Sequence, residues 1–154
     1  MADQCKVEDS NNIFTIKLIG SKLDAKIKET LESSKVIAIV GLSPKEDRPS
    51  NDVARYLKEK GYKIIPVNPG HEEILGEKSY PSLSAITEKV DIVDIFRKSS
   101  EVLPVVEEAI KLNPKCIWLQ LGIANDEAKR IAEENGIFFV QDKCIKLEHI
   151  RLFH

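Results

Sequence analysis

The sequence predicts an α/β domain built around a parallel sheet of five strands. Short, continuous apolar runs recur along the chain, and amphipathic segments separate them. A run without apolar–polar alternation is typical of a strand that is buried on both faces of a parallel sheet. Amphipathic helices between such strands cover the two faces of the sheet and produce three layers.

The expected strands are the five apolar runs, which span residues 36–40, 63–67, 91–96, 116–121 and 137–140. Right-handed crossovers between them predict a doubly wound, Rossmann-like sandwich with the strand order 3-2-1-4-5. Pro66 is awkward within the second run, because proline has no N–H group to donate to a neighbouring strand. We therefore expect Pro66 to lie near the end of its strand.

Helices are expected between the strands and at both ends of the domain. Apolar residues recur every four positions from Leu23 to Leu31 and predict an amphipathic helix that begins near Ser21. Further helices are expected over residues 50–60, 100–112, 125–135 and 143–152. The polar residues 1–20 are expected to form a mobile leader, and residues 21–154 a single domain.

Composition excludes several classes of function. The chain has 154 residues, of which 42% are hydrophobic and 31% charged, so it can bury a core. Lys and Arg number 23 against 25 acids, and the formal net charge of −2 leaves no basic excess for nucleic acid. The longest apolar run, Val36–Val40, is far shorter than the roughly 20 residues that cross a membrane. Because the N-terminus carries no secretory signal, we expect a soluble domain in the cytoplasm.

The cysteines and histidines form no recognisable metal or disulfide pattern. Cys5, Cys116 and Cys144 are odd in number and contain no CxxC pair, which indicates a reducing compartment. The three histidines are scattered along the chain, so no metal site is expected.

The loop after the first strand has the features of an anion site. Ligands of open α/β sheets bind beyond the carboxyl ends of the strands. Gly41 permits a tight turn there, and the next helix begins soon after, with free N–H groups in its first turn. Ser43 and Ser50 add hydroxyl groups, and Arg48 can grip phosphate oxygens. The loop lacks the glycines of a dinucleotide or Walker A motif, and the alternative is an ordinary turn in which Ser50 or Asp47 caps the helix.

The loop after the second strand, Asn68-Pro69-Gly70, bears on the kind of nucleotide. Nicotinamide-binding folds usually place an acid here to hold the ribose hydroxyl groups. Asn68 stands in place of that acid, which disfavours NAD and suits a ribose that carries a phosphate. The alternative is a plain turn, since Asn-Pro-Gly favours one in any case.

Two more strand ends offer polar and aromatic side chains. Phe96 can pack on an adenine ring and Arg97 can meet a phosphate, although Phe96 also fits a core position. Gln120 can bind a ligand amide or pair with neighbouring backbone. On the third strand, Asp91 stands at the start and Asp94 can cap a neighbouring element, so they predict no acid–base pair.

Six segments together resemble a known family. In chain order they span residues 41–50, 62–70, 75–83, 91–97, 118–122 and 142–149. They make the chain similar to the small stand-alone CoA-binding domain proteins, which are related to the N-terminal CoA-binding domain of the succinyl-CoA synthetase α subunit. The resemblance covers about residues 35–151 and implies a Rossmann-like fold that holds coenzyme A at the strand ends.

The resemblance also implies a role for each loop. The residues that would take the phosphates are Gly41, Leu42, Ser43, Arg48, Pro49 and Ser50. Those that would border the adenosine are Val67, Asn68 and Pro69. Phe96 and Arg97 would flank the nucleotide, and Gln120 and Gly122 would line the path to the pantetheine arm. No second domain or catalytic histidine of the larger relatives has a counterpart, so the resemblance implies binding and not ligase catalysis.

The leading hypothesis is therefore a non-catalytic carrier, sensor or regulator whose partner is CoA or an acyl-CoA. It involves no nucleic acid, membrane or metal, and the sequence leaves the identity of any protein partner open. A first alternative is a minimal NAD(P)-dependent oxidoreductase. A second is a thiol or redox sensor in which Cys144, beside Lys143, forms a mixed disulfide with CoA, although Cys144 also fits a structural position.

Overall fold

The computed structural model of the protein describes residues 2–153, with the side chains of residues 15–153. Its helices and strands are α1 (Ala2–Ser33), β1 (Val36–Val40), α2 (Pro49–Glu59), β2 (Lys63–Val67), β3 (Glu73–Ile74), β4 (Glu77–Lys78), β5 (Ile92–Ile95), α3 (Val102–Ile110), β6 (Cys116–Leu119), α4 (Asp126–Glu134), β7 (Phe138–Val140) and α5 (Ile145–Leu152). The five apolar runs of the sequence all form strands, each within two residues of the expected ends.

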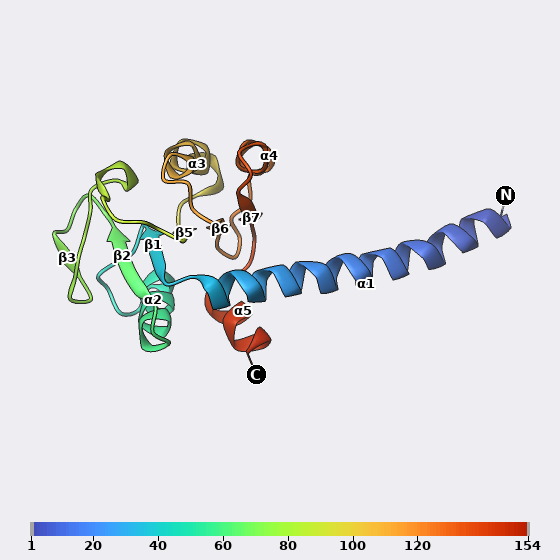
Figure 1. The fold of residues 1–154 in the computed structure, drawn as a ribbon, viewed down its shortest axis with the longest axis horizontal. Coiled ribbons are helices and arrows are strands. Elements are labelled where there is room, and N and C mark those ends of the chain that lie inside the picture. The colour runs from blue at the N-terminus through green and yellow to red at the C-terminus, as the bar shows by residue number, and fades with distance from the viewer. Residues whose placement is uncertain (1, 154) are drawn as a thin grey trace.

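Five strands form one parallel sheet in the spatial order β2-β1-β5-β6-β7, which confirms the α/β, Rossmann-like fold class (Figure 1). β3 and β4 form a separate antiparallel pair. The predicted strand order is wrong: numbered along the chain, the five strands lie in the order 2-1-3-4-5 and not 3-2-1-4-5. The third strand, β5, therefore pairs with β1 instead of β2.

Pro66 explains why β2 lies at the edge of the sheet. Val67 faces β1, because its carbonyl accepts a hydrogen bond from the Gly41 N–H at 2.9 Å. Pro66 faces the other side, where its carbonyl accepts from the Tyr80 N–H at 2.9 Å. A further strand on that side would need an N–H donor at position 66, and proline has none. The third strand along the chain, β5, therefore pairs with β1.

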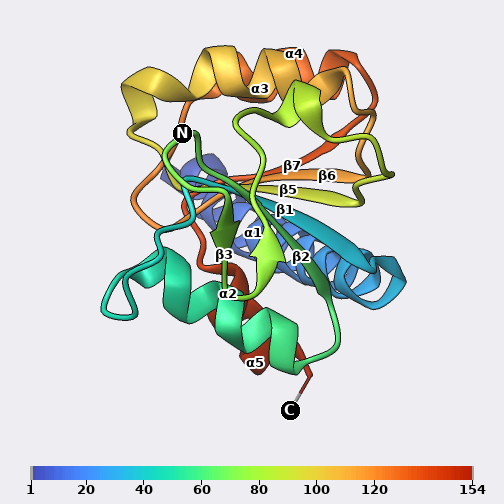
Figure 2. The ribbon, with the colours of Figure 1, turned by 90° about the vertical axis from the view of Figure 1, so that its left-hand side faces the viewer.

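The sheet separates two apolar cores, with helices on both faces (Figure 2). On one face, α3 and α4 contribute buried residues such as Val106 and Ala128. On the other face, α1, α2 and α5 contribute Ile27, Leu57 and Ile145, each fully buried. Burial on both faces is the physical reason that the strands read as continuous apolar runs.

Helix α1 is longer than the sequence predicted. Ile27 and Leu31, near its C-terminal end, pack into the core, while its N-terminal half extends away from the sheet (Figure 1). The helix begins at Ala2 rather than near Ser21, so the expected boundary at residue 20 lies inside a helix. Independent movement of residues 1–20 stays a prediction.

Candidate functional site

The topology brings the ends of three strands together at one edge of the sheet. β1 lies between β2 and β5, so the strand order reverses at β1. Such a reversal opens a crevice at the carboxyl ends of parallel strands, where ligands of this architecture bind. The loops after β1, β2 and β5 meet at this point, and most of the residues predicted for the site lie in these loops.

The loop after β1 is held in shape by contacts to the start of α2. The Ser43 N–H donates to Oγ of Ser50 at 3.0 Å, and Nδ2 of Asn51 donates to the Ser43 carbonyl at 2.8 Å. Ser50 and Asn51 are both buried. Because these contacts stay within the protein, the loop has its shape before any ligand arrives.

The N-terminus of α2 leaves a backbone donor for an anion. Arg48 precedes the helix and no side chain caps it, so the predicted alternative of a cap by Ser50 or Asp47 is not observed. The N–H groups of Asn51 and Asp52 donate to the Arg48 carbonyl, each at 3.1 Å. In the part of the chain that the structure describes, the Ser50 N–H has no acceptor. A free N–H at a helix N-terminus is a typical contact for phosphate.

Gly41 brings this loop against the end of β5. Its φ angle is +84°, and a Cβ atom there would lie 2.4 Å from the carbonyl oxygen of Phe96. Only glycine meets both conditions without strain. This close approach places Phe96 and Arg97 beside the first loop.

Asn68 connects the loop after β2 to the loop after β1. Its Nδ2 donates to the Leu42 carbonyl at 3.0 Å, and its Oδ1 accepts from the Gly70 N–H at 2.9 Å. The side chain therefore acts as a brace between two loops. Asn68 has a single acceptor oxygen, which already accepts one hydrogen bond, whereas an acid offers two carboxylate oxygens to ribose hydroxyl groups.

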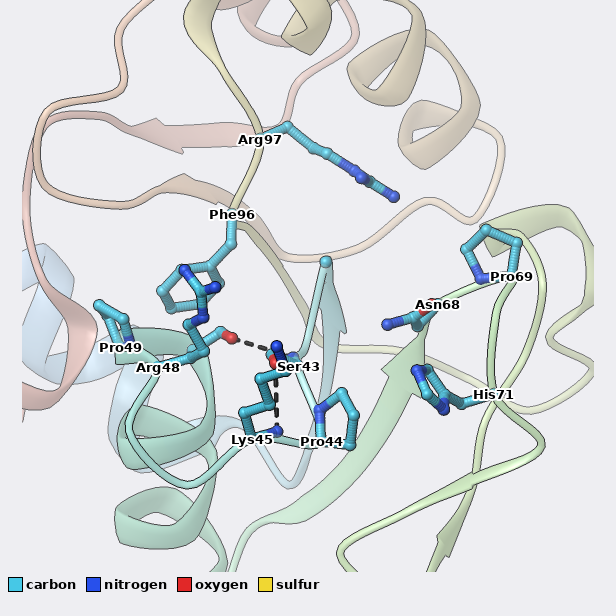
Figure 3. A pocket seen from close by; sticks show the side chains of 12 residues that line it. Ser43, Pro44, Lys45, Arg48, Pro49, Asn68, Pro69, His71, Phe96 and Arg97 are labelled. Carbon is cyan, nitrogen blue, oxygen red and sulfur yellow. Dashed lines mark hydrogen bonds between the residues drawn. The ribbon is translucent and has the colours of Figure 1, made fainter.

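A cavity of about 560 Å³ lies between these three loops (Figure 3). We call it the cationic cavity, and its lining consists of Gly41, Ser43, Pro44, Lys45, Arg48, Pro49, Ser50, Asn68, Pro69, His71, Phe96 and Arg97. Lys45, Arg48 and Arg97 are positively charged, and none of these lining residues is an acid. A hollow of about 700 Å³ continues past Asn68 and Pro69 toward β4. The combination of cations and a free helix N–H suits an anionic ligand.

Most of the predicted site residues line the cationic cavity, and four do not. Leu42 and Val67 are buried in the core and contribute only backbone to the loops. Gln120 and Gly122 follow β6, which is one strand further from β1 than the predicted order placed it. The Gly122 N–H instead donates to Asp142 at 2.7 Å.

Pro44, Lys45 and His71 also line the cavity, although they are not among the residues predicted for the site. Pro44 and Lys45 lie inside the predicted phosphate loop. The positive charge of Lys45 was the sequence feature from which Lys45 could have been predicted as a site residue. His71 directly follows the Asn-Pro-Gly turn, and no sequence motif marks it.

A second cavity, of about 440 Å³, adjoins the first, and we call it the apolar cavity. Pro49 and Phe96 line both. The remaining lining comes from α2, the end of β6 and α5, and consists of Asp52, Val53, Gln120, Leu121, Ile123, Cys144, Lys146 and Leu147. Cys144 is partly exposed in this wall.

The segment 142–149, which has no evident role in the sequence, attaches α5 to the rest of the fold. Nε1 of Trp118 donates to the Lys143 carbonyl at 2.7 Å, and the Ile145 N–H donates to Oε1 of Gln120 at 3.1 Å. Lys146 and Asp52 form an ion pair at 2.8 Å. These contacts hold the wall of the apolar cavity against α2 and β6. The Gln120 oxygen thus pairs with backbone, one of the two alternatives that the sequence left open.

The two acids near the third strand lie away from both cavities. Asp91 accepts hydrogen bonds from the N–H groups of Lys35 and Val36 at 2.8 and 3.0 Å, which links β5 to the start of β1. Asp94 is fully buried, and neither carboxylate oxygen has a partner among the described residues. It caps no element, and burial raises its pKa well above the usual range. Burial, and then the proximity of Asp94, likewise raise the pKa of the Cys116 thiol.

Two further classes of site are not seen among the described residues. In residues 15–153, whose side chains the structure describes, no three His, Cys, Asp or Glu side chains are placed to hold a metal ion together. In the same part of the chain, no helix has the length and apolar character to span a membrane.

The parallel sheet, with a cavity lined by cations at the point where the strand order reverses, defines an α/β, Rossmann-like domain. Residues 35–150 match the CoA binding domain family, and the chain belongs to that family. The resemblance described from the sequence is therefore confirmed.

Three relatives illustrate the family. The uncharacterized protein YneT of Bacillus subtilis is 43% identical over 125 residues, which cover 81% of this chain and 93% of YneT. The structure of a hypothetical protein from Pyrococcus horikoshii OT3 matches with a TM-score of 0.82 and 44% identity, over 85% of this chain and 92% of that one. The ADP-forming acetate–CoA ligase I of Archaeoglobus fulgidus is 30% identical over 127 residues, which are 76% of this chain but 18% of the ligase. The family therefore contains small proteins of this size and parts of much larger ligases.

Proposed function

We propose that the protein binds coenzyme A or an acyl-CoA at the carboxyl ends of β1, β2 and β5. The observation that carries this proposal is the cationic cavity, which combines Lys45, Arg48 and Arg97 with the free Ser50 N–H and has no acid in its lining. Coenzyme A is a nucleotide with a diphosphate and a 3′-phosphate, so it requires several cationic contacts in one place. Membership of the CoA binding domain family supports the same ligand.

The ligand is expected to lie with its diphosphate at the N-terminus of α2. Arg48 and the Ser50 N–H provide a charged and a neutral donor there. The adenosine then lies toward Asn68 and Pro69, where the hollow of about 700 Å³ gives it room. Arg97, from the opposite side of the cavity, adds charge for the 3′-phosphate (Figure 3).

Binding of NAD or NADP is the less supported alternative. Recognition of NAD usually depends on an acid that accepts hydrogen bonds from the ribose. Asn68 occupies that position, and its oxygen already accepts from the Gly70 N–H. The single glycine of the first loop also differs from the dinucleotide-binding pattern.

Calorimetric titration with CoA, dephospho-CoA, NAD and NADP tests the proposal. We expect CoA to bind most tightly and dephospho-CoA more weakly, because it lacks the 3′-phosphate. A CoA dissociation constant above about 1 mM, equivalent to only about −4 kcal/mol, would refute CoA as the ligand. Equal affinity for NADP and CoA would show that the site recognises a phosphorylated ribose in general.

The proposed role is that of a non-catalytic carrier, sensor or regulator in the cytoplasm. Among the described residues that line the two cavities, no nucleophile, base and third group that orients the base come together. The part that the ligase of Archaeoglobus fulgidus shares with this chain is 18% of its length. Incubation of the protein with acyl-CoA should therefore release no free thiol above the rate in buffer, as measured with a thiol reagent.

A second candidate function is that of a thiol sensor, and the position of Cys144 supports it. Cys144 is partly exposed in the apolar cavity, which adjoins the proposed nucleotide site, whereas Cys116 is fully buried. The thiolate of Cys144 would attack the disulfide of oxidised CoA, form a protein–CoA disulfide and release one CoA thiolate. Mass spectrometry should then show one CoA adduct, which Cys144→Ser abolishes. An unmodified protein, or an adduct that persists in Cys144→Ser, would end this candidate.

A further inference from the structure

We propose that the apolar cavity holds the acyl group of an acyl-CoA and that the site selects short, uncharged acyl groups over free CoA. This inference rests on the proposed function, because it uses the nucleotide held in the cationic cavity as its anchor. It goes further in that it names the class of thioester.

The two cavities adjoin each other and differ in character. Pro49 and Phe96 line both, so a long ligand that occupies the two cavities would contact these two side chains. The lining of the cationic cavity has three positive side chains and no acid, whereas most of the lining of the apolar cavity is hydrocarbon. A ligand that fills both must have an anionic end and an apolar end, and an acyl-CoA has both.

The rim of the apolar cavity carries two leucines that are exposed to water. The side chains of Leu121 and Leu147 are among the most exposed large apolar residues described, at 65% and 56%. Val53, which is buried, lines the same cavity. Exposed apolar groups that cluster at a cavity commonly mark a binding surface, because a ligand that covers them removes apolar area from water. An acyl chain that lies between these leucines would gain this free energy, and the thiol of free CoA would not.

The charged groups of the apolar cavity are already paired. Nζ of Lys146 lies 2.8 Å from Oδ2 of Asp52 and also lies over the Tyr56 ring, 5.6 Å from its centre. Among the described residues, no unpaired cation therefore remains in this wall to hold an acyl carboxylate. The wall consequently favours uncharged acyl groups over dicarboxylic ones such as succinyl.

Gln120 provides one directional contact in this cavity. Its Oε1 accepts from the Ile145 N–H at 3.1 Å, and this bond fixes the orientation of the side-chain amide. Among the described residues, Nε2 of Gln120 has no acceptor. It can donate to the carbonyl oxygen of the thioester or of the pantetheine arm. This contact corresponds to the position that the resemblance implies for Gln120, on the path to the pantetheine arm.

A chain-length series tests the inference by isothermal titration calorimetry. The ligands are CoA, acetyl-CoA, butyryl-CoA, hexanoyl-CoA and succinyl-CoA. We expect affinity to rise by about two- to fourfold for each methylene from acetyl to hexanoyl, as for hydrocarbon transferred out of water. Succinyl-CoA should bind no more tightly than CoA. If CoA binds and all four thioesters match its affinity, the inference is wrong while the proposed function stands; if none of the five binds, the proposed function itself fails.

A variant of the rim provides the structural test. Leu147→Glu should remove the advantage of hexanoyl-CoA over CoA, with both affinities measured in the same variant, because it places a charge beside the acyl chain. Leu18→Glu, at an exposed leucine of α1, is the matched control and should keep the full advantage. If hexanoyl-CoA remains favoured in Leu147→Glu as in the control, the acyl group does not lie in this cavity.

One further ligand separates acyl-CoA from other amphiphiles. Hexyl phosphate has an anion and a six-carbon chain but no pantetheine arm to span the distance between the cavities. We expect it to bind at least 100-fold more weakly than hexanoyl-CoA. Comparable affinity would assign the site to alkyl phosphates and overturn the inference.

Discussion

The phenolic oxygen of Tyr56 lies 2.7 Å from Nδ1 of His149 and joins α2 to α5. The two rings meet edge to face at 5.4 Å, and Phe153 stacks on His149 at 4.5 Å. His149 is buried, although it lies near the C-terminal end of the described chain. The contact gives a physical role to the end of segment 142–149: it fixes the helix that supplies one wall of the apolar cavity.

Removal of this hydrogen bond should weaken the attachment of α5. Tyr56→Phe keeps the ring contacts and deletes the hydroxyl group, so we expect a loss of about 1–2 kcal/mol in the free energy of unfolding. Urea denaturation at neutral pH measures the loss. Tyr80→Phe is the matched control, because the described residues offer the Tyr80 hydroxyl no hydrogen bond, and it should change stability by less than about 0.5 kcal/mol. Equal midpoints for both variants would contradict the proposed role of the bond.

Because Gly41 lies close to the Phe96 carbonyl, a methyl group added at position 41 should lower the stability of the fold strongly. Gly41→Ala should destabilise the fold and abolish CoA binding, because its Cβ would lie 2.4 Å from the Phe96 carbonyl oxygen. Gly122 has the same φ of +84°, but a Cβ there would meet no described atom within 4 Å, so Gly122→Ala is the matched control. The control should cost about 1–2 kcal/mol from backbone strain alone, and Gly41→Ala at least about 2 kcal/mol more. Thermal denaturation of both variants measures the difference, and similar melting temperatures would mean that the loop moves away from Phe96 at little cost.

The strands could be predicted from the sequence because each is a short apolar run buried on two faces. Their order could not, since it depends on which strand edges pair, and several orders satisfy the same burial. Pro66 was the available signal: it faces outward from β2 and accepts a bond from Tyr80 without being able to donate one. A proline that faces the outer edge places its strand at the end of the sheet, which leaves β1 as the neighbour of the third strand.

The strand order also decides how the predicted site residues are grouped. With β5 next to β1, Phe96 and Arg97 join Gly41 in the cationic cavity, whereas Gln120 lies one strand further away in the apolar cavity. The loop residues Ser43 and Arg48 could be predicted because a helix N-terminus after a buried strand is a local feature. The role of segment 142–149 could not, because its partners come from distant parts of the chain.

Arg48 is expected to contact phosphate and not adenosine. Arg48→Ala should weaken CoA binding by about tenfold, or about 1.4 kcal/mol, and leave adenosine binding unchanged, because only CoA presents phosphate oxygens. Arg130→Ala is the control: Arg130 lies on α4, pairs with Glu127 and Glu134, and lines neither cavity. Titration of both variants with the two ligands decides the matter. Equal losses for CoA and adenosine in Arg48→Ala would show that it shapes the site rather than binding phosphate.

Asp94 should reduce the stability of the protein at neutral and alkaline pH. Its carboxyl group is fully buried without a hydrogen-bond partner among the described residues, and burial raises its pKa well above the usual range. The unfolded chain releases this proton above about pH 4, whereas the folded chain retains it. The folded state therefore binds more protons over that interval, and the contribution of Asp94 to stability falls as pH rises toward its raised pKa.

Asp94→Val should remove this penalty, since valine fills a similar volume and suits a buried strand. We expect the variant to exceed the wild type by about 1–3 kcal/mol at pH 8 and by less at pH 4, as measured by urea denaturation across that range. Asp91→Val, the control just before the same strand, should do the opposite and destabilise the fold at pH 8, because the Asp91 carboxylate accepts from two backbone N–H groups. A gain for Asp94→Val that is constant from pH 4 to pH 8 would reflect packing alone and would rule out titration of the buried carboxyl group as its cause.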